Sequence, residues 1–316
     1  MNALTGLVER LRESRGFRHK SDLSGVLSRL PEAAQAVPIG DDCAAISDGD
    51  GYLLFAIEGM VSDFVRAMPW FAGYSGVMVN VSDIYAMGGR PLAVVDALWS
   101  GDAQAAAEVL AGMAAASAAY GVPIVGGHSN VRSDGAQLAV AIVGRAKTLL
   151  TSFDARPGDA LVMAVDLRGR FEDPYPFWNA SVGAPEGRAR GDFELLPAMA
   201  EDGLCDAAKD ISMAGALGTA LMLLECSKAG ARIDLDAVPR PEGVDFERWL
   251  AAFPSFGFVL SVRPEHVDEV LARFASRDLA SAVIGEVDAS REVVLKRDGD
   301  AALLWNLHEQ PFICAR

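Results

Sequence analysis

Residues 52–146 alternate strand-like apolar runs with helices rich in small side chains, and this alternation constrains the fold more than any other feature. The run 52–57 is apolar and is bracketed by Gly51 and Gly59, which predicts a strand. Residues 70–89 are mostly small or apolar and end in two glycines, which predicts a helix packed closely on a sheet. Further elements are expected at 91–99 (strand), 102–121 (helix), 122–127 (strand) and 136–146 (strand). The pattern is typical of α/β or α+β sheets.

The second half of the chain is less regular. A turn-like Arg-Pro-Gly-Asp sequence at 156–159 precedes a predicted strand at 160–166. We therefore place a boundary near residue 150, which gives domains 1–150 and 151–316. Residues 171–193 are rich in Pro, Gly and aromatic residues without a clear period, which predicts a long loop. Further elements are expected at 213–230 (helix), 231–239 (strand), 257–262 (strand), 264–278 (helix) and 280–287 (strand).

Charge and cysteine content exclude several classes of function. Lys and Arg number 28 and Asp and Glu 43, a net charge of −15, which argues against nucleic acid as a partner. The apolar runs have the length of strands, so we expect no membrane span. Residues 1–17 carry scattered charges and resemble an amphipathic helix, not a signal peptide. The cysteines Cys43, Cys205, Cys226 and Cys314 show no metal-binding spacing, which predicts small core residues in a reducing, cytoplasmic setting.

Several acids lie in loops or at element ends in the first half. Asp41 and Asp42 follow Gly40, Glu58 ends the strand 52–57, and Asp83 lies within the small-residue helix. Acids that a fold brings together form the hard oxygen-ligand site that magnesium prefers, often with substrate phosphates as further ligands. The alternative is that Asp41 and Asp42 are ordinary turn residues, because Asp is common in turns.

A second candidate element is the Gly-Gly-His-Ser sequence Gly126, Gly127, His128 and Ser129. Two glycines after a strand allow a backbone to approach a ligand such as a phosphate, and the two polar side chains could donate hydrogen bonds to it. The alternative is that His128 only caps a loop. The sequence contains no dinucleotide-binding glycine motif after a strand and no Walker A motif, which argues against both common nucleotide sites.

The order of several segments resembles the aminoimidazole ribonucleotide (AIR) synthetase superfamily, which includes thiamine-monophosphate kinase and selenophosphate synthetase. These segments are PIGDDCAAI (38–46), VNVSDIYAMGGRPLAVVDAL (79–98), VPIVGGHSN (122–130), VGRA (143–146) and RPGD (156–159). The resemblance spans residues 36–160 and continues more faintly over 210–239. It implies a two-domain α/β (α+β) fold: an N-terminal mixed sheet with helices that pairs with a second subunit in a homodimer, and a C-terminal α+β domain. It also implies ATP and Mg²⁺ as cofactors.

The resemblance assigns roles to the acids of the first half. Asp83 is similar to the acid of the family's Asn-x-Ser-Asp motif, a magnesium ligand with a role in catalysis. Asn80 and Ser82 then fix the helix and the carboxylate. Asp41 and Asp42 match the Gly-Asp-Asp acids, also metal ligands.

Other residues receive roles in the same way. Glu58 falls where the family has an Asp, so it is a further candidate ligand. Arg145 matches an arginine that can reach phosphate as a bidentate donor. Asp210 begins the second-domain motif and is a candidate catalytic residue near the acceptor. Lys20 could also reach a phosphate, or it could be an ordinary solvated surface lysine.

The chain departs from the family at informative positions. His128 stands where thiamine-monophosphate kinase has an Asp, and Met213 replaces the second acid of the motif that begins at Asp210. No cysteine precedes Cys43, so selenium transfer is not expected. None of the named reactions can therefore be assigned directly.

Three functional hypotheses follow. The first is an ATP-dependent, magnesium-requiring enzyme that phosphorylates or activates an oxygen of a small molecule, with the acceptor near Asp210, Ser212 and residues 171–178. The second is a catalytically degenerate subunit that binds a nucleotide or a partner protein. The third is a binding module without a nucleotide.

Overall fold

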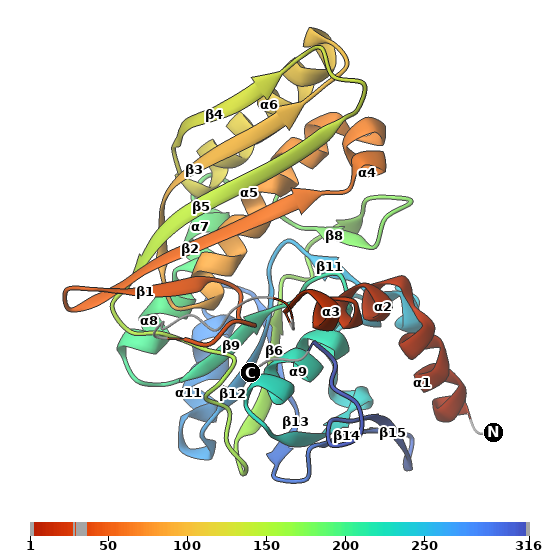
Figure 1. The fold of residues 1–316 in the computed structure, drawn as a ribbon. Coiled ribbons are helices and arrows are strands. Elements are labelled where there is room, and N and C mark those ends of the chain that lie inside the picture. Colours follow the sequence, from red (N-terminus) through yellow and green to blue (C-terminus); the bar gives the residue numbers. More distant parts are fainter. Residues whose placement is uncertain (1–2, 28, 30–36, 314–316) are drawn as a thin grey trace. The chain divides into compact units, whose positions relative to one another are not determined.

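The computed structural model describes residues 3–27, 29 and 37–313, and the chain forms two compact units (Figure 1). Unit 1 contains Met1–Asp41, Leu150–Val182 and Ala198–Arg316, and unit 2 contains Asp42–Leu149 and Gly183–Pro197. The chain returns to unit 1 at residue 150, where the sequence places its boundary. This division differs from the predicted domains, because the N-terminal segment lies in unit 1 and residues 183–197 lie in unit 2.

Unit 2 is built on a mixed five-stranded sheet with the order β1-β2-β5-β3-β4. Its strands are β1 (Ala44–Asp48), β2 (Gly51–Met60), β3 (Arg90–Trp99), β4 (Ile124–Asn130) and β5 (Gln137–Ala146). Only the pair β3–β4 is parallel, and the other neighbours are antiparallel. Leu54 of β2 and Val140 and Ile142 of β5 are buried, which marks the face that the helices cover.

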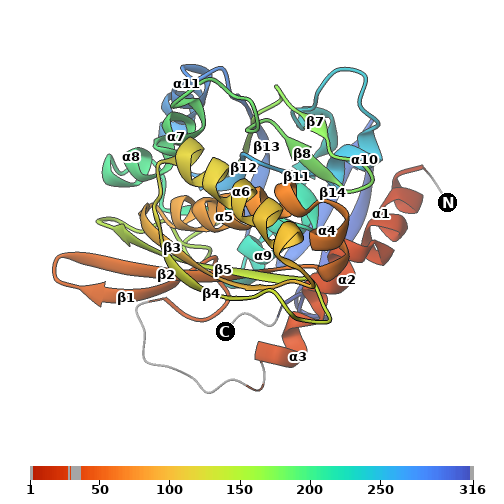
Figure 2. The same cartoon turned by 90° about the horizontal axis from the view of Figure 1, so that it is seen from above.

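Two helices cover that face of the sheet, α5 (Pro69–Ala86) and α6 (Ala103–Tyr120) (Figure 2). Asp102 caps α6, since its carboxylate accepts a hydrogen bond of 2.8 Å from Ala105 N, and Gly121 ends the helix with φ of 67°. The two helices approach backbone to backbone. A Cβ atom on Gly73 would lie 2.0 Å from Val109 O, and one on Gly112 would lie 1.8 Å from Trp70 O.

The segment 183–197 contacts the rest of unit 2 through the Phe193 ring, which packs on Tyr85 and Tyr120, and through a hydrogen-bonded carboxylate. This group belongs to Glu194, which follows the short helix α7 (Arg188–Phe193). The carboxylate accepts hydrogen bonds from Tyr85 Oη at 3.0 Å and from Arg90 Nε at 2.8 Å. Burial, followed by the nearby Glu194 charge, raises the pKa of Tyr85 well above its usual value. The phenol therefore stays protonated and continues to donate to Glu194.

Unit 1 contains a seven-stranded sheet with the order β15-β14-β10-β13-β6-β12-β9. Its strands are β6 (Ala160–Val165), β9 (Ala207–Asp210), β10 (Gly230–Asp234), β12 (Gly257–Val262), β13 (Ala280–Asp288), β14 (Glu292–Arg297) and β15 (Asp300–Asn306). A small sheet consists of β7 (Arg170–Phe171), β8 (Phe177–Asn179) and β11 (Phe253–Pro254). The principal helices are α9 (Gly215–Cys226), which is buried throughout its length, and α11 (Val267–Ala275). Shorter helices are α4 (Ser62–Ala67) in unit 2, α8 (Leu195–Glu201), α10 (Phe246–Leu250), η1 (Leu235–Ala237) and η2 (Pro264–His266).

The N-terminal helices α1 (Ala3–Glu13), α2 (Arg15–Ser21) and α3 (Leu23–Leu27) belong to unit 1. The apolar residues Leu4, Leu7, Val8 and Leu11 of α1 are buried in its core. Arg12 donates a hydrogen bond of 2.8 Å to Leu304 O of β15. A Cβ atom on Gly16 would lie 2.2 Å from Met213 O, so α2 contacts the start of the α9 region without an intervening side chain.

The structure confirms most predicted elements and corrects two. Residues 171–193, predicted to be a loop, contain β7, β8 and α7. Gly126 and Gly127 do not form a turn after a strand, because they lie inside β4. Cys43, Cys205 and Cys226 are buried as predicted, and Cys314 lies outside the described residues. No helix in the described part of the chain combines the length and the apolar character needed to cross a bilayer.

The close approach of α5 and α6 predicts a steric effect of Gly112→Ala. A new methyl group would meet Trp70 O, so we expect the unfolding free energy to fall by about 1–3 kcal/mol. Gly25→Ala in α3 is the matched control, because nothing lies within 4 Å of its Cβ position. This change should leave the stability unchanged or raise it by up to about 1 kcal/mol. Urea unfolding measures both, and equal stabilities would contradict the packing argument.

Candidate functional site

Two predicted metal ligands, Asp42 and Asp83, lie together in unit 2. Asp42 precedes β1, and Asp83 is a buried residue near the end of α5. A carboxylate oxygen of Asp42 and one of Asp83 lie within 4.8 Å of each other. Neighbouring ligands of an octahedral magnesium ion lie about 3 Å apart, and carboxylate oxygens are the donors it prefers. The two residues therefore have the donor type and the proximity that a magnesium ion requires.

Asn80 lies one turn before Asp83 on α5 and is fully buried. Its Nδ2 donates a hydrogen bond of 2.7 Å to Gly76 O, while its Oδ1 is buried without a hydrogen-bond partner among the described residues. A buried amide oxygen without a partner is costly in a folded protein. The Asn80 Oδ1 is therefore an available acceptor, one helical turn before the Asp83 carboxylate. Ser82 is also buried.

Asp41, although adjacent to Asp42 in the chain, belongs to a different set of contacts in unit 1. Its carboxylate accepts hydrogen bonds from Ser152 N at 2.8 Å and from Ser152 Oγ at 2.6 Å. Lys209 Nζ lies 3.8 Å from Asp41 Oδ1, and both side chains are almost completely buried. Neither Ser152 nor Lys209 was predicted from the sequence. A lysine between Ala208 and Asp210 in the short, buried strand β9 was the one available signal.

Glu58 is exposed on β2, opposite Val140 of β5. Among the described residues, Glu58 does not belong to the cluster of acidic residues that contains Asp42 and Asp83. Arg145, on β5, forms an ion pair of 2.5 Å with Asp48, and about half of each side chain is exposed. Exposed ion pairs contribute little stability, so Arg145 can exchange this partner for another anion at small cost.

The residues Gly126, Gly127, His128 and Ser129 are all exposed in the edge strand β4. The His128 ring lies 6.2 Å from the Trp99 ring of β3. A Cβ atom on Gly127 would lie 2.2 Å from Asp96 Oδ1, so the Asp96 carboxylate occupies the space that a side chain would take. A negative charge at this position opposes phosphate binding on the same face of Gly127.

Asp96 is partly buried on β3. The sequence analysis did not identify it as a candidate functional residue. Its Oδ2 is buried and has no hydrogen-bond partner among the described residues. Burial raises the pKa of Asp96 above its usual value, because desolvation disfavours the charged form.

Three other predicted residues lie in unit 1. Lys20 is half-buried on α2. Asp210 is buried at the end of β9, and its carbonyl accepts a hydrogen bond of 3.2 Å from Thr219 Oγ1. Ser212 N donates to the same Thr219 hydroxyl at 3.3 Å, while Ser212 Oγ is buried without a partner among the described residues.

Sequence profiles of two domains match the chain, and together they define its class. The profile of the AIR synthase related protein N-terminal domain matches residues 40–146, and that of the C-terminal domain matches residues 182–298. The chain belongs to the AIR synthase related family, as the sequence resemblance predicted. An uncharacterized protein of Synechocystis sp. is 48% identical over 313 residues, covering 98% of this chain and 97% of that protein.

Solved structures confirm the two-domain AIR-synthetase-like fold. T. maritima PurL complexed with ATP superposes with a TM-score of 0.76 at 21% identity, covering 96% of this chain and 55% of PurL. AaThiL complexed with AMPPCP and TMP gives a TM-score of 0.66 at 22% identity, covering 83% of this chain and 88% of AaThiL. The chain thus spans about half the length of PurL, and it spans most of AaThiL.

The raised pKa of Asp96 predicts a pH-dependent effect of Asp96→Asn. The pKa of Asp96 is higher in the folded protein than in the unfolded chain. The charged carboxylate therefore lowers the unfolding free energy as pH rises above the ordinary Asp pKa of about 3.9. We expect the variant to be more stable than the wild type at pH 7, by up to about 1 kcal/mol because partial exposure screens the penalty. The difference should vanish below the ordinary pKa.

Urea unfolding at pH 7 and at a pH of about 3.5, below that ordinary pKa, tests this expectation. Glu108→Gln, on the exposed surface of α6, is the matched control and should not change the stability at either pH. A less stable Asp96→Asn variant at pH 7 would show that the charged carboxylate has a favourable partner.

Proposed function

We propose that the protein is an ATP-dependent, magnesium-requiring enzyme, of the kinase or cyclo-ligase type, that phosphorylates or activates an oxygen of a small molecule. The observation that carries the proposal is the Asp42–Asp83 carboxylate pair in a chain of the AIR synthase related family. The complexes of PurL with ATP and of AaThiL with AMPPCP support the choice of an adenine nucleotide.

The residues of unit 2 have distinct roles in this proposal. Asp42 and Asp83 would hold Mg²⁺. The Asn80 amide oxygen, one turn before Asp83 on α5, has no hydrogen-bond partner among the described residues and is available to a ligand. A bound Mg²⁺ would supply positive charge to the ATP phosphates. Arg145 exchanges Asp48 for a phosphate oxygen and neutralises charge there. The segment Gly126–Ser129 remains a candidate contact for the nucleotide, through its exposed backbone and the His128 and Ser129 side chains.

Unit 1 provides the residues proposed for the acceptor. Asp210 is the candidate catalytic acid, and the unpartnered Ser212 Oγ is available to donate a hydrogen bond to a small molecule. The hairpin that carries β7 and β8 adds aromatic surface, since the Tyr175 and Phe177 rings stack at 5.2 Å. Lys20 remains a candidate phosphate contact. The predicted cytoplasmic location also remains a prediction.

A catalytically degenerate nucleotide-binding or partner-binding subunit is the second candidate function. Met213 replaces an acid of the family motif, and its carbonyl packs against Gly16 of α2. This alternative predicts clean ATP binding without ATP consumption in the presence of any acceptor.

We further propose that a second copy of the chain covers the outer face of the unit 2 sheet. Phe55 and Ile57 of β2 and Val95 of β3 are 49%, 63% and 41% exposed. They alternate with the buried residues of their strands, so they share the face opposite the helices. Val125 of β4 is 64% exposed. A contiguous apolar face of this kind is typical of a subunit interface.

The metal site predicts that Asp83→Asn weakens nucleotide binding without unfolding the protein. Titration calorimetry with AMPPCP and Mg²⁺ should give micromolar affinity for the wild type, about −8 kcal/mol. Loss of the ligand charge should reduce that affinity at least about 10-fold. Asp63→Asn, an exposed acid of α4, is the control and should bind as the wild type does. Unchanged affinity in the Asp83→Asn variant would remove the basis of the assignment.

The exposed sheet face predicts that Ile57→Lys converts a dimer into a monomer. A charge at the centre of an apolar interface would be buried without a partner, which should raise the dissociation constant at least about 100-fold. Sedimentation velocity measures the change. Val283→Lys, at a 39% exposed position of unit 1, is the matched control. A monomeric wild type would refute the proposed interface.

A further inference from the structure

One carboxylate in unit 2 closes the turn between α5 and β3. It belongs to Glu194, in the segment Gly183–Pro197, which we call the strap. Tyr85 Oη, near the end of α5, donates to Glu194 Oε1 at 3.0 Å, and Arg90 Nε, at the start of β3, donates to Glu194 Oε2 at 2.8 Å. Each carboxylate oxygen therefore has a donor from a different side of the turn.

The strap also packs on both helices that cover the sheet. The centroid of the Phe193 ring lies 5.2 Å from that of Tyr85 on α5 and 5.7 Å from that of Tyr120 on α6. All three rings are buried, so the residue before Glu194 is held in place by close packing. The Glu194 carboxylate is therefore preorganised for its two donors.

The last turn of α5 carries a proposed magnesium ligand, Asp83, two residues before Tyr85. Met87 N donates to Asp83 O at 3.3 Å, and Gly88 N donates to Tyr85 O at 2.9 Å, so the helix ends within this turn. Helix ends fray easily. The hydrogen bond from Tyr85 to Glu194 restrains this end, and a displacement of Tyr85 would also move the backbone that carries Asp83.

Both ends of the strap continue into unit 1. Strand β8, which precedes the strap, ends at Asn179, whose Oδ1 accepts hydrogen bonds from Ser181 N at 3.1 Å and from Val182 N at 3.0 Å. These bonds stiffen the connection. Strand β8 belongs to the β7–β8 hairpin, which we propose as a contact of the acceptor. The strap is thus a short covalent path from that hairpin to the turn that carries Asp83.

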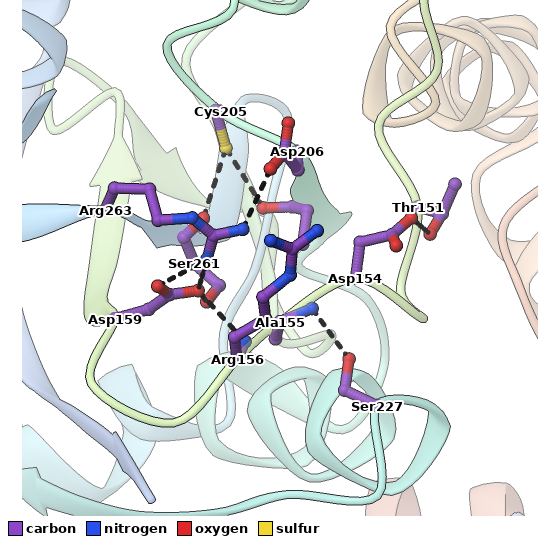
Figure 3. A network of polar contacts seen from close by, with 11 residues as sticks. Thr151, Asp154, Ala155, Arg156, Asp159, Cys205, Asp206, Ser227, Ser261 and Arg263 are labelled. Carbon is purple, nitrogen blue, oxygen red and sulfur yellow. Dashed lines mark hydrogen bonds and ion pairs between the residues drawn. The ribbon is translucent and has the colours of Figure 1, made fainter.

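Another crossing of the chain between the units, at residues 149 and 150, is anchored by contacts within unit 1 (Figure 3). Thr151 N donates to Asp206 O at 3.0 Å, and Ala155 N donates to Ser227 Oγ at 3.0 Å. These contacts brace the chain inside unit 1, whereas the contacts of the strap fix the end of α5.

We infer that Glu194 is a positioning residue for Asp83, and that the strap couples the β7–β8 hairpin to the magnesium site. The inference rests on the proposed function, because it concerns the geometry and regulation of that same site. An acceptor that orders the hairpin would hold Glu194 on Tyr85 through the strap and keep the Asp83 carboxylate in position. Nucleotide binding would order the strap in return, because coupling between two binding sites is reciprocal.

The test of the positioning role measures Mn²⁺ binding with AMPPCP by electron paramagnetic resonance. Tyr85→Phe removes the donor and keeps the ring on Phe193, and Glu194→Gln removes the charge at similar size. We expect Glu194→Gln to weaken Mn²⁺ binding about 3- to 10-fold, less than the loss of a direct partner of a metal ligand would cause. Since both changes remove the same contact, the double variant should bind no more weakly than Glu194→Gln.

A control and a stability measurement separate positioning from a structural role. Glu186→Gln, at an exposed position of the strap, is the matched control and should bind Mn²⁺ as the wild type does. In urea unfolding, loss of a hydrogen bond to the carboxylate should lower the folding equilibrium constant of Glu194→Gln roughly 10-fold. A purely structural role would lower this stability without changing the Mn²⁺ affinity of the folded protein.

Hydrogen exchange tests the coupling. Saturating Mg²⁺ and AMPPCP should slow amide exchange in residues 188–194 and in the β7–β8 hairpin of the wild type, because ordering of the strap reduces local opening. The slowing in the hairpin should be lost in Glu194→Gln and kept in Glu186→Gln.

Each outcome bears on a different claim. A Glu194→Gln variant with the Mn²⁺ affinity of the wild type would overturn the positioning role, while the proposed function stands. Additive losses in the double variant would show that Glu194 does not act through Tyr85, which also overturns that role. Unchanged exchange in the hairpin would refute the coupling. A wild type that binds no Mn²⁺ with AMPPCP would overturn the proposed function, and the inference with it.

Discussion

Unit 2 depends on the burial of helix α5 from every side. Its residues from Phe71 to Ala86 are all buried. Gly73 and Gly112 contribute to this burial, because they let the backbones of α5 and α6 touch. A polar group placed in such a helix loses its water and must receive another partner. Asn80 and Asp83 are therefore the least expected residues of the helix on stability grounds. The Asn80 Oδ1 has no hydrogen-bond partner among the described residues, and a ligand could provide that compensation.

Two adjacent carboxylates show how context sets the role of a residue type. Asp41 receives Ser152 and Lys209 inside unit 1, whereas Asp42 pairs with a second carboxylate, Asp83, in unit 2. Two close acids repel each other and favour a bound cation. An acid beside a buried ammonium does not need one. Asp41 thus forms structural contacts within unit 1, and the next residue, Asp42, is a candidate metal ligand.

The features that depend on local chemistry could be predicted from the sequence. Helix α6 begins after Asp102 and ends before Gly121 as expected, because capping is decided within one turn. The family resemblance identified the fold and brought attention to Asp42 and Asp83. The pairing of Lys209 with Asp41 could not be predicted, because no periodicity relates residues of two distant segments. The glycines expected to follow a strand and approach a ligand instead lie inside β4, where the small size of Gly127 accommodates Asp96 from the adjacent strand.

The N-terminal helices have a consequence for synthesis on the ribosome. The apolar side chains of α1 are buried in unit 1, and Arg12 contacts Leu304 of β15, which is made 292 residues later. Residues 42–149 form one continuous stretch of unit 2, so most of that sheet can form while the rest of the chain is still absent. The apolar surface of α1 cannot be covered completely until β15 has been made. During that interval it is exposed apolar surface, of the kind that chaperones bind.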